Sequence, residues 1–292
     1  MTRKPIVAIV GAGSLATFLA TALHQAGFTI SEIVVRDTPP SRRRGRALAQ
    51  KVDAQAVTAL SATLDATLLW LCVPDREIRG AAAVLVDQLA HRASTRKKNE
   101  IRCAFHSSGA LLSRELDPLR KAGTAVASVH PLMTFVPGAH PSLTGVPFAM
   151  EGDAAAMRLA RRIIRDLGGE SFRLPAKRKA AYHAWATMTS PLLLAFLVTL
   201  EEAASAAGLT REEARRKSLP IIRETLANYS RLGPAHSFSG PLIRGDAETV
   251  AKHLAVLKER PGARKVYVSL AQAALRGLPV KNRNELKRLL RI

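Results

Sequence analysis

Short apolar runs alternate with longer amphipathic stretches through the first half of the chain. The apolar runs have the length of strands and lie at 6–10, 32–36, 67–73, 101–106 and 124–129, with a weaker one at 56–60. Stretches with helical spacing lie between them, at 14–26, 41–51, 75–91 and 111–122. Because strands that alternate with helices are typical of βαβ units, this pattern predicts a mainly parallel sheet with helices on both faces.

Proline and glycine become frequent at 131–147, which marks a connector. A short strand at 146–150 and a helix at 153–167 complete the predicted first domain, and Gly168 and Gly169 are suited to ending that helix. The charged run at 92–100 is expected to form a surface loop.

Beyond residue 175 the pattern changes to consecutive helical periodicities without strand-like alternation. They lie at 177–207, 211–232, 246–259, 263–276 and 284–290. Pro191 and Pro220 fall inside the first two, and we expect a kink or a break at each, because proline cannot donate the helical hydrogen bond. The chain is therefore predicted to have an α/β domain at 1–174 and an all-α domain at 175–292.

The composition is that of a globular protein. The chain has 292 residues, of which 47% are hydrophobic and 23% are charged, enough to bury a core in each of two domains. Uninterrupted apolar runs stay below the roughly 20 residues that span a bilayer, and the N-terminus lacks the features of a signal peptide. Cys72 and Cys103 lie in strand-like segments, which favours free thiols over a disulfide or a metal site. We expect a cytoplasmic protein without a membrane segment or a bound metal.

The charge balance is strongly basic, with 44 lysines and arginines against 23 acidic residues and a formal net charge of +21. Such a field attracts anions, including nucleic acids and phosphorylated cofactors. The basic residues are scattered over several segments, however, and aromatic residues are only 4% of the chain, which leaves few side chains for base stacking. A solvated basic surface is therefore the preferred interpretation, and nucleic-acid binding is the alternative.

A glycine motif follows the first predicted strand directly. It consists of Gly11, Ala12, Gly13, Ser14, Leu15 and Ala16. The first glycine permits a tight turn, the second lets a pyrophosphate approach the backbone, and Ala16 still allows close helix–strand packing in place of a third glycine. The exposed N–H groups at the start of the following helix bind phosphates. The motif predicts a doubly wound Rossmann domain whose six motif residues bind a nicotinamide dinucleotide.

The second predicted strand ends at Arg36, where the ribose of such a dinucleotide is recognised. An acidic residue there would bind the 2′-hydroxyl of NAD, whereas an arginine suits the 2′-phosphate of NADP. Arg42, Arg43 and Arg44 lie nearby and can add charge. Asp37 keeps NAD as the alternative, because a shift of one residue would bring its carboxylate to the ribose. We expect NADP.

Polar side chains gather where three further strands end. They are Val73-Pro74-Asp75, His106-Ser107-Ser108-Gly109 and His130-Pro131. Ligands of open α/β sheets bind beyond the carboxyl ends of the strands, so these residues are expected to border the site. Asp75 also fits the N-cap of the helix that follows. The two histidines and the serines can polarise a carbonyl group or relay a proton.

The helical half carries two further candidate groups. Lys179, Tyr182 and His183 share one helical stretch, with Lys179 and His183 four residues apart on one face. A lysine beside the nicotinamide can protonate the alkoxide that forms when hydride reaches a carbonyl, although a basic helix start is an equally good interpretation. Arg244 is suited to binding a substrate carboxylate, and Asp246 is suited either to the site or to capping the following helix.

These features together resemble the two-domain Rossmann-like proteins that carry the domain of unknown function 2520. The matching pieces are the motif from Gly11 to Ala16, Val73-Pro74-Asp75, His106-Ser107-Ser108-Gly109, His130-Pro131, Tyr182-His183, and Gly240-Pro241 with Arg244-Gly245-Asp246. The resemblance spans nearly the whole chain. In plan the family is similar to pyrroline-5-carboxylate reductases, ketopantoate reductases and β-hydroxyacid dehydrogenases.

The resemblance implies an NADP-dependent oxidoreductase that transfers hydride between nicotinamide and a small oxo or imino acid, with ketopantoate one candidate. It also implies a homodimer formed through the helical domain. In that scheme His106 and Ser107 contact the nicotinamide or the carbonyl, Lys179 or His183 donates the proton, and His130, Tyr182 and Arg244 bind substrate. Many relatives carry an asparagine about eight residues after the Tyr-His pair, where this chain has Ser190 and Pro191. Either Ser190 substitutes for that asparagine in binding substrate, or the substrate differs.

Two alternatives to an enzyme stay open at this point. A dinucleotide sensor without catalytic activity would keep the Rossmann site and report redox state to a partner. A nucleic-acid-associated protein would explain the charge of +21 and would bind with a steep dependence on salt.

Overall fold

The computed structural model describes residues 4–91, 100–139 and 142–291, so nearly all of the charged loop expected at 92–100 lies outside the described part. The strands are β1 (Val7–Val10), β2 (Ile30–Val35), β3 (Gln55–Thr58), β4 (Leu68–Leu71), β5 (Cys103–His106), β6 (Ala125–Pro131), β7 (Pro147–Gly152) and β8 (Glu170–Arg173). The helices of the same unit are α1 (Ser14–Gln25), α2 (Pro39–Lys51), α3 (Ile78–His91), α4 (Asp117–Lys121), α5 (Ala154–Asp166) and α6 (Lys179–Thr189), which continues past the unit's last residue.

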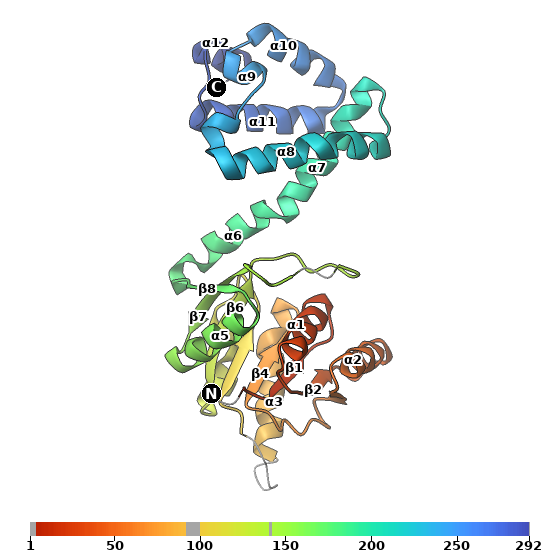
Figure 1. The fold of residues 1–292 in the computed structure, drawn as a ribbon, viewed down its shortest axis with the longest axis vertical. Helices are drawn as coiled ribbons and strands as arrows, with labels where there is room; N and C mark the ends of the chain where they lie inside the picture. Colours follow the sequence, from red (N-terminus) through yellow and green to blue (C-terminus); the bar gives the residue numbers. More distant parts are fainter. Residues whose placement is uncertain (1–3, 92–99, 140–141, 292) are drawn as a thin grey trace. The chain divides into compact units, whose positions relative to one another are not determined.

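The strands form one sheet in the order β3-β2-β1-β4-β5-β6-β7-β8. Every neighbouring pair is parallel except β6 and β7. The order reverses direction at β1, which is where an open parallel sheet leaves a crevice for a ligand. The predicted doubly wound, mainly parallel sheet is confirmed, and Figure 1 labels most of its strands.

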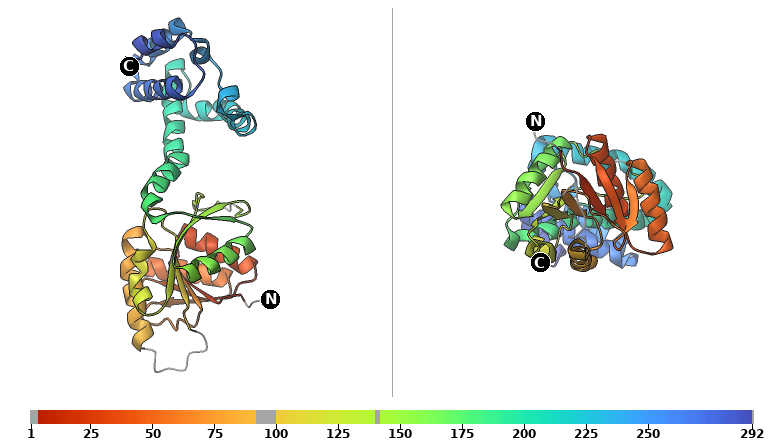
Figure 2. Two further views of the ribbon diagram at one scale, coloured as in Figure 1. Left: turned by 90° about the vertical axis from the view of Figure 1, so that its left-hand side faces the viewer. Right: turned by 90° about the horizontal axis from the view of Figure 1, so that it is seen from below.

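The alternation of side chains along β1 explains why helices cover both faces. Val7 and Ile9 belong to a core built with α1, α2 and α5, whereas Ala8 and Val10 belong to a second core built with α3 and α4. Successive strand residues point to opposite faces, so a strand that is covered on both faces is apolar at every position. Figure 2 shows α3 and α4 on one side of the sheet and α1 and α5 on the other.

One strand of the first unit and the end of that unit differ from the sequence prediction. Strand β8 follows Gly168 and Gly169, and no apolar alternation marked it, because most of its side chains are exposed at the edge of the sheet. The compact first unit ends at Ala186, beyond the boundary expected at residue 174. The helix that carries Lys179, Tyr182 and His183 therefore belongs to the unit with the sheet.

The second unit, Thr187–Ile292, is helical. Its elements are α7 (Pro191–Ala204), α8 (Arg211–Ser237), α9 (Pro241–Arg244), α10 (Ala247–Val256), α11 (Pro261–Gly277) and α12 (Arg283–Leu289). The break expected at Pro191 is present, because α6 ends at Thr189 and Ser190 is not helical. The break expected at Pro220 is not found there. The backbone of α8 leaves the helical region at Gly233 instead, where φ is 74°.

The helical stretch Ala176–Ala207 meets the criteria for a membrane-crossing helix by length and composition alone. Its 32 residues include an 18-residue window with a mean hydropathy of 1.4, and none of that window is buried. Polar residues such as His183 and Ser190 interrupt the apolar run, which is why the sequence indicated no span. The absence of a membrane segment stays a prediction.

Candidate functional site

The glycine motif forms a tight turn between β1 and α1. Gly11 has a φ of 114°, and a Cβ at this position would lie 2.4 Å from the carbonyl oxygen of Cys72, so no other residue fits. A Cβ at Gly13 would meet no atom within 4 Å, which means that the backbone faces open space there. No side chain caps α1, and its first turn has no acidic residue. The N–H groups at the start of α1 are thus available to an anion.

A hollow of about 570 Å³ opens at this turn. Of the residues expected to bind the dinucleotide, it is lined by Gly11, Ala12, Gly13, Arg36, Val73 and Pro74. The others lie elsewhere: Ala16 is buried in the core, Ser14 borders a different hollow beside α1, and Leu15, Asp75 and Ser108 are not among the lining residues. The hollow has the size of a small-molecule site.

Two arginines line the hollow on the side of β2. Arg36 follows β2 directly and lies 3.2 Å from the carboxylate of Glu77, which also lines the hollow. Arg44, one of the three nearby arginines expected to add charge, is the second arginine, whereas Glu77 was not predicted from the sequence. Asp37, which kept NAD as an alternative, instead forms an ion pair with Arg42 and does not line the hollow. The charge that this side offers a ligand is therefore mainly positive.

A hydrogen bond joins the ends of β4 and β5. The Ser108 hydroxyl donates to the carboxylate of Asp75 at 2.8 Å and accepts from the backbone N–H of Leu111 at 2.9 Å. Asp75 is the first residue of the short 3₁₀ turn Asp75–Glu77, and its side chain makes no capping bond to that turn. The N-cap role considered for Asp75 is thus not what its side chain does. It holds the loop after β5 instead.

His106 and Ser107 are buried, and the structure gives their polar atoms partners inside the protein. The ring of His106 accepts from the Ser108 N–H through Nδ1 at 3.1 Å and lies 3.0 Å from the Leu112 carbonyl through Nε2. Burial lowers the pKa of His106 to about 4, so the ring stays neutral near pH 7. The Ser107 hydroxyl accepts from the indole N–H of Trp70 at 2.9 Å. Both side chains are suited to shaping the loop.

Lys179 is the first residue of α6 and is only 2% exposed. Its ammonium group donates to the hydroxyl of Ser128 in β6. That hydroxyl in turn donates to the backbone carbonyl of Ser108 at 3.1 Å. Burial lowers the pKa of Lys179 to about 8, and the negative charges of Glu151 and Asp75 limit the shift. A lysine with a pKa near the working pH can release and recover a proton.

The rings of His130, Tyr182 and His183 lie close together beside Gly109. Nδ1 of His130 lies 2.8 Å from the hydroxyl of Tyr182, so the two groups share a hydrogen bond. Burial raises the pKa of Tyr182 to about 12, so the hydroxyl keeps its proton. Burial, with the charge of Lys179, lowers the pKa of His130 to about 4. A Cβ at Gly109 would lie 2.6 Å from the ring of His183 and 2.8 Å from that of His130. Gly109 thus lets the two rings close over the loop.

The strand ends and α6 therefore bring together most of the predicted site residues of the first unit: Asp75, His106, Ser107, Ser108, His130, Lys179, Tyr182 and His183. Ser128 was missed by the sequence analysis. A signal was available, because Ser128 is a polar residue two positions before His130 in an otherwise apolar strand and so shares its face. Glu77 gave no signal, because it lies on a helical turn whose orientation depends on the fold.

The remaining predicted residues belong to the second unit. Ser190 precedes α7, and Arg244 is the last residue of α9. Asp246 caps α10, where its carboxylate accepts from the N–H of Thr249 at 3.0 Å, and this bond lowers the pKa of Asp246. The capping interpretation of Asp246 is confirmed. The metal-free expectation is untested, although no cluster of three or more His, Cys, Asp or Glu side chains occurs among the described residues.

The buried position of Lys179 predicts a specific dependence of stability on pH. An unfolded lysine titrates near 10.4 and the folded one near 8. Between these values the unfolded chain binds more protons, so this group's contribution to the free energy of unfolding rises with pH by about 1.4 kcal/mol per unit and is level below pH 8. We expect urea unfolding of Lys179→Met to lack that rise between pH 8 and 10, relative to the natural chain. Trp70 and Trp185, both in the first unit, provide the fluorescence signal.

A matched control is Lys121→Met, which removes an exposed amine from the same unit. It should keep the rise. Parallel pH profiles for the natural chain and Lys179→Met would show that the ammonium group is not buried.

Comparisons with known proteins match both halves of the chain. Residues 2–131 match a Rossmann-like domain, and residues 146–274 match the family described as domain of unknown function 2520. No curated protein matches the sequence.

Several solved structures share the fold. A protein from Bacteroides fragilis assigned as an NADP oxidoreductase is 23% identical, with a TM-score of 0.72 over 92% of this chain and 97% of that one. An imine reductase from Myxococcus stipitatus, in complex with NADP+, is 16% identical, with a TM-score of 0.64 over 98% and 100%. A pyrroline-5-carboxylate reductase from Coxiella burnetii is 16% identical, with a TM-score of 0.59 over 98% and 99%. At these identities the likeness establishes the fold.

The resemblance noted from the strand-end motifs is thereby confirmed, since the two matched regions cover both halves in the expected order. The chain belongs to the two-domain Rossmann-like proteins that carry the domain of unknown function 2520.

Proposed function

We propose that the chain is an NADP-dependent oxidoreductase that transfers hydride between nicotinamide and a small oxo or imino acid. The observation that carries the proposal is the hollow at the glycine turn, which has open backbone at Gly13 and arginines on the side of β2. The N–H groups of α1 would hold the pyrophosphate, and Arg36 and Arg44 would hold the 2′-phosphate. Free thiols at Cys72 and Cys103 suit a reducing cytoplasm, where we place the enzyme.

The fold neighbours support this cofactor choice. The Myxococcus stipitatus imine reductase binds NADP+, and a reductive aminase from Aspergillus terreus binds NADPH. Both align with this chain over almost its full length. Both act on carbonyl or imine groups by name, which agrees with an oxo or imino acid as the substrate class.

In the proposed mechanism Lys179 is the proton donor. A nicotinamide dinucleotide, when bound, would supply or accept the hydride. With a pKa of about 8, most Lys179 side chains carry a proton near pH 7, ready for the oxygen or nitrogen that becomes negative as hydride reaches the adjacent carbon. Ser128 orients the ammonium group. Tyr182 and His130, which share a hydrogen bond, are the proposed contacts to the substrate, and His183 is the alternative donor.

Two catalytic roles expected from the sequence change. His106 and Ser107 were expected to contact the nicotinamide or the carbonyl, but their polar atoms are bonded to the Ser108 and Leu112 backbone and to Trp70. We assign them a positioning role for the loop that carries Ser108. Arg244 as the anchor of a substrate carboxylate, and Ser190 in place of the family's asparagine, stay predictions.

We also propose a homodimer formed through the second unit. Apolar side chains of α7 and α8 are strongly exposed, among them Leu192 at 53%, Leu194 at 63%, Ile221 at 68% and Tyr229 at 60%. Large exposed apolar areas mark interfaces. We favour a second copy over a membrane, because α8 also carries Arg215, Arg216, Lys217 and Arg223, which are exposed and would resist entry into a bilayer.

The cofactor assignment is tested by comparing NADPH with NADH in a thermal-shift assay. NADPH at 100 times its dissociation constant should stabilise the protein by about 2.7 kcal/mol. Arg36→Ala should weaken NADPH about tenfold or more, because a charge-assisted bond to the 2′-phosphate is lost, and leave NADH unchanged. Arg42→Ala, which removes an arginine outside the hollow, is the matched control. A shift with NADH and none with NADPH would refute the assignment.

The donor assignment is tested by an NADPH-oxidation screen over oxo and imino acids. With an acid that reacts, Lys179→Met should lower kcat by about 10² to 10⁴ while NADPH binding persists. Activity in the direction of reduction should also fall as pH rises through 8, where Lys179 loses its proton. If His183→Asn alone abolishes turnover, the donor is His183. If NADPH binds and no acid oxidises it, a dinucleotide sensor replaces the enzyme.

The dimer is tested by light scattering of the purified chain. Leu194→Glu together with Ile221→Glu should convert a dimer into a monomer, because each places a charge on an apolar exposed face. Lys287→Glu changes the charge of α12 at an exposed site and should leave the dimer intact. A natural chain that is monomeric and binds neutral phospholipid vesicles would show that the apolar face meets a membrane.

A further inference from the structure

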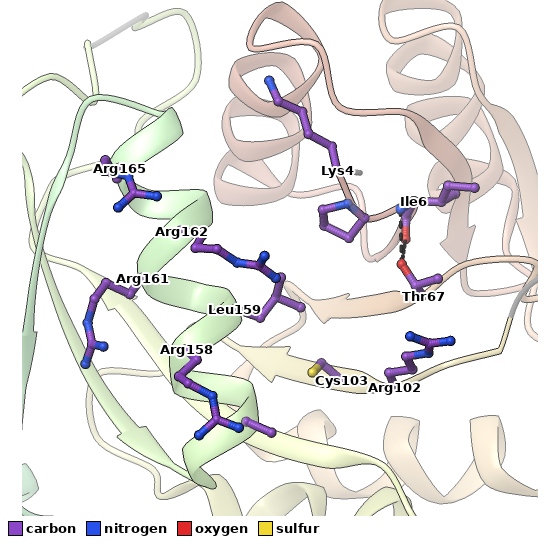
Figure 3. Close-up of a pocket in the computed structure, with 12 residues that line it drawn as sticks. Lys4, Ile6, Thr67, Arg102, Cys103, Arg158, Leu159, Arg161, Arg162 and Arg165 are labelled. Carbon is purple, nitrogen blue, oxygen red and sulfur yellow. Dashed lines mark hydrogen bonds between the residues drawn. The ribbon is translucent and has the colours of Figure 1, made fainter. Parts of the chain in front are cut away.

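A second hollow lies at the amino ends of the sheet strands, whereas the glycine turn lies at their carboxyl ends. It has a volume of about 860 Å³, and its lining includes Ile6, Thr67 and Arg102, the residues that directly precede β1, β4 and β5. The glycine turn and the strand-end cluster lie beyond the other ends of the same strands. Figure 3 shows this hollow between α5 and the amino ends of the strands. The cavity is therefore separate from the proposed dinucleotide site.

The lining of this hollow is strongly positive. Its charged members are Lys4, Arg102, Arg158, Arg161, Arg162 and Arg165, and none of its lining residues is acidic. The four arginines of α5 repeat at intervals of three and four residues, which places them along one face of the helix. Figure 3 shows the Arg162 side chain reaching from α5 toward the strands, on the side where Lys4 and Arg102 lie, whereas Arg161 points away from them.

Such an arrangement works against the stability of α5. Like charges three or four residues apart on a helix repel one another. Among the described residues, no carboxylate lies within ion-pair distance of Arg102, Arg158, Arg161 or Arg165, since none of the ion pairs found involves them. Departures of this kind from local stability rules are typical of binding sites.

The carboxylates nearest in sequence to this arginine face are engaged or directed elsewhere. Asp153, just before α5, forms an ion pair with Arg120 at 3.1 Å. Asp166, the last residue of α5, borders the hollow beside α1. Burial raises the pKa of Cys103 at the base of the hollow, the charges of Arg162 and Arg102 oppose that rise, and the charge of Asp153 adds to it. Both guanidinium groups therefore act on the interior of the cavity.

We propose that this hollow binds a small anion that carries two or more phosphate groups. Guanidinium groups bind phosphate oxygens in pairs, and several of them around one cavity suit several phosphates better than one carboxylate. Pro5, Ile6 and Leu159 supply an apolar wall for the remainder of such a ligand. A nucleic acid fits less well, because the lining contains no aromatic side chain on which a base can stack.

The proposal also changes the interpretation of the net charge of +21. The four arginines of α5 form one of the several basic segments that are scattered along the sequence. The fold gathers its four arginines with Lys4 and Arg102, which are distant in the chain. Part of the basic excess is therefore a defined site.

The test is isothermal titration of inorganic tripolyphosphate into the full chain, with saturating NADPH to fill the glycine-turn hollow. Arg158→Gln, Arg161→Gln and Arg165→Gln together should weaken binding at least about tenfold, because three charge-assisted contacts are lost. Arg216→Gln, Lys217→Gln and Arg223→Gln remove the same charge from exposed positions of α8 and should change the affinity less than about twofold. Circular dichroism and the melting temperature show whether each triple variant folds.

Several outcomes would overturn the proposal. Equal losses in the two triple variants would mean that tripolyphosphate senses only net charge. Unchanged binding in the α5 variant would place the anion elsewhere. A single-stranded oligonucleotide that displaces tripolyphosphate, and whose affinity grows with its length, would make the surface a nucleic-acid site. If NADPH does not bind, the comparison of the two variants still locates the anion, so this proposal and the proposed function fail separately.

Discussion

The burial of the Lys179 ammonium group constrains the arrangement of the whole strand-end cluster. A charge with 2% exposure is costly unless polar groups surround it. The Ser128 hydroxyl accepts a hydrogen bond from the ammonium group and donates one to the Ser108 carbonyl, and the Asp75 carboxylate accepts one from the Ser108 hydroxyl. The loop after β5 is consequently fixed by both α6 and β4. Helix α6 and the loop after β5 are thus joined by one network of hydrogen bonds.

The two ends of the parallel sheet have taken on different electrostatic characters. At the carboxyl ends, neutral histidines, a tyrosine and one lysine of lowered pKa form a compact hydrogen-bonded group. At the amino ends, fixed guanidinium charges surround a hollow without acidic lining residues. Because strands of one sheet connect these ends, the same core supports a group that can exchange protons and a group that cannot. Burial explains the first, and solvent exposure of the arginines explains the second.

The sequence predicted the fold well, because its signals were local. The apolar runs located every strand except β8, and Gly11 has the positive φ that the predicted tight turn needs. Lys179, Tyr182 and His183 were recognised by their spacing, but their unit was misjudged, since a helix gives no sign of which core it joins. The role of His106 could not be predicted, because its partners, Leu112 and the Ser108 backbone, depend on the conformation of one loop. The place of Glu77 in the first hollow, and the proximity of Lys4 to Arg102, depend only on three-dimensional packing.

The contact between Arg36 and Glu77 has a consequence for how the first hollow stays ready for a ligand. The Arg36 side chain is 66% exposed and the Glu77 side chain 26% exposed, so water screens the contact and it contributes less than about 1 kcal/mol. A dianionic group arriving beside β2 can therefore displace the carboxylate at little cost. Before a ligand binds, Glu77 restrains the Arg36 side chain, which would otherwise sample many rotamers. The Glu77 carboxylate thus occupies the place of the ligand's anionic group, orients Arg36, and is displaced when a more highly charged anion binds.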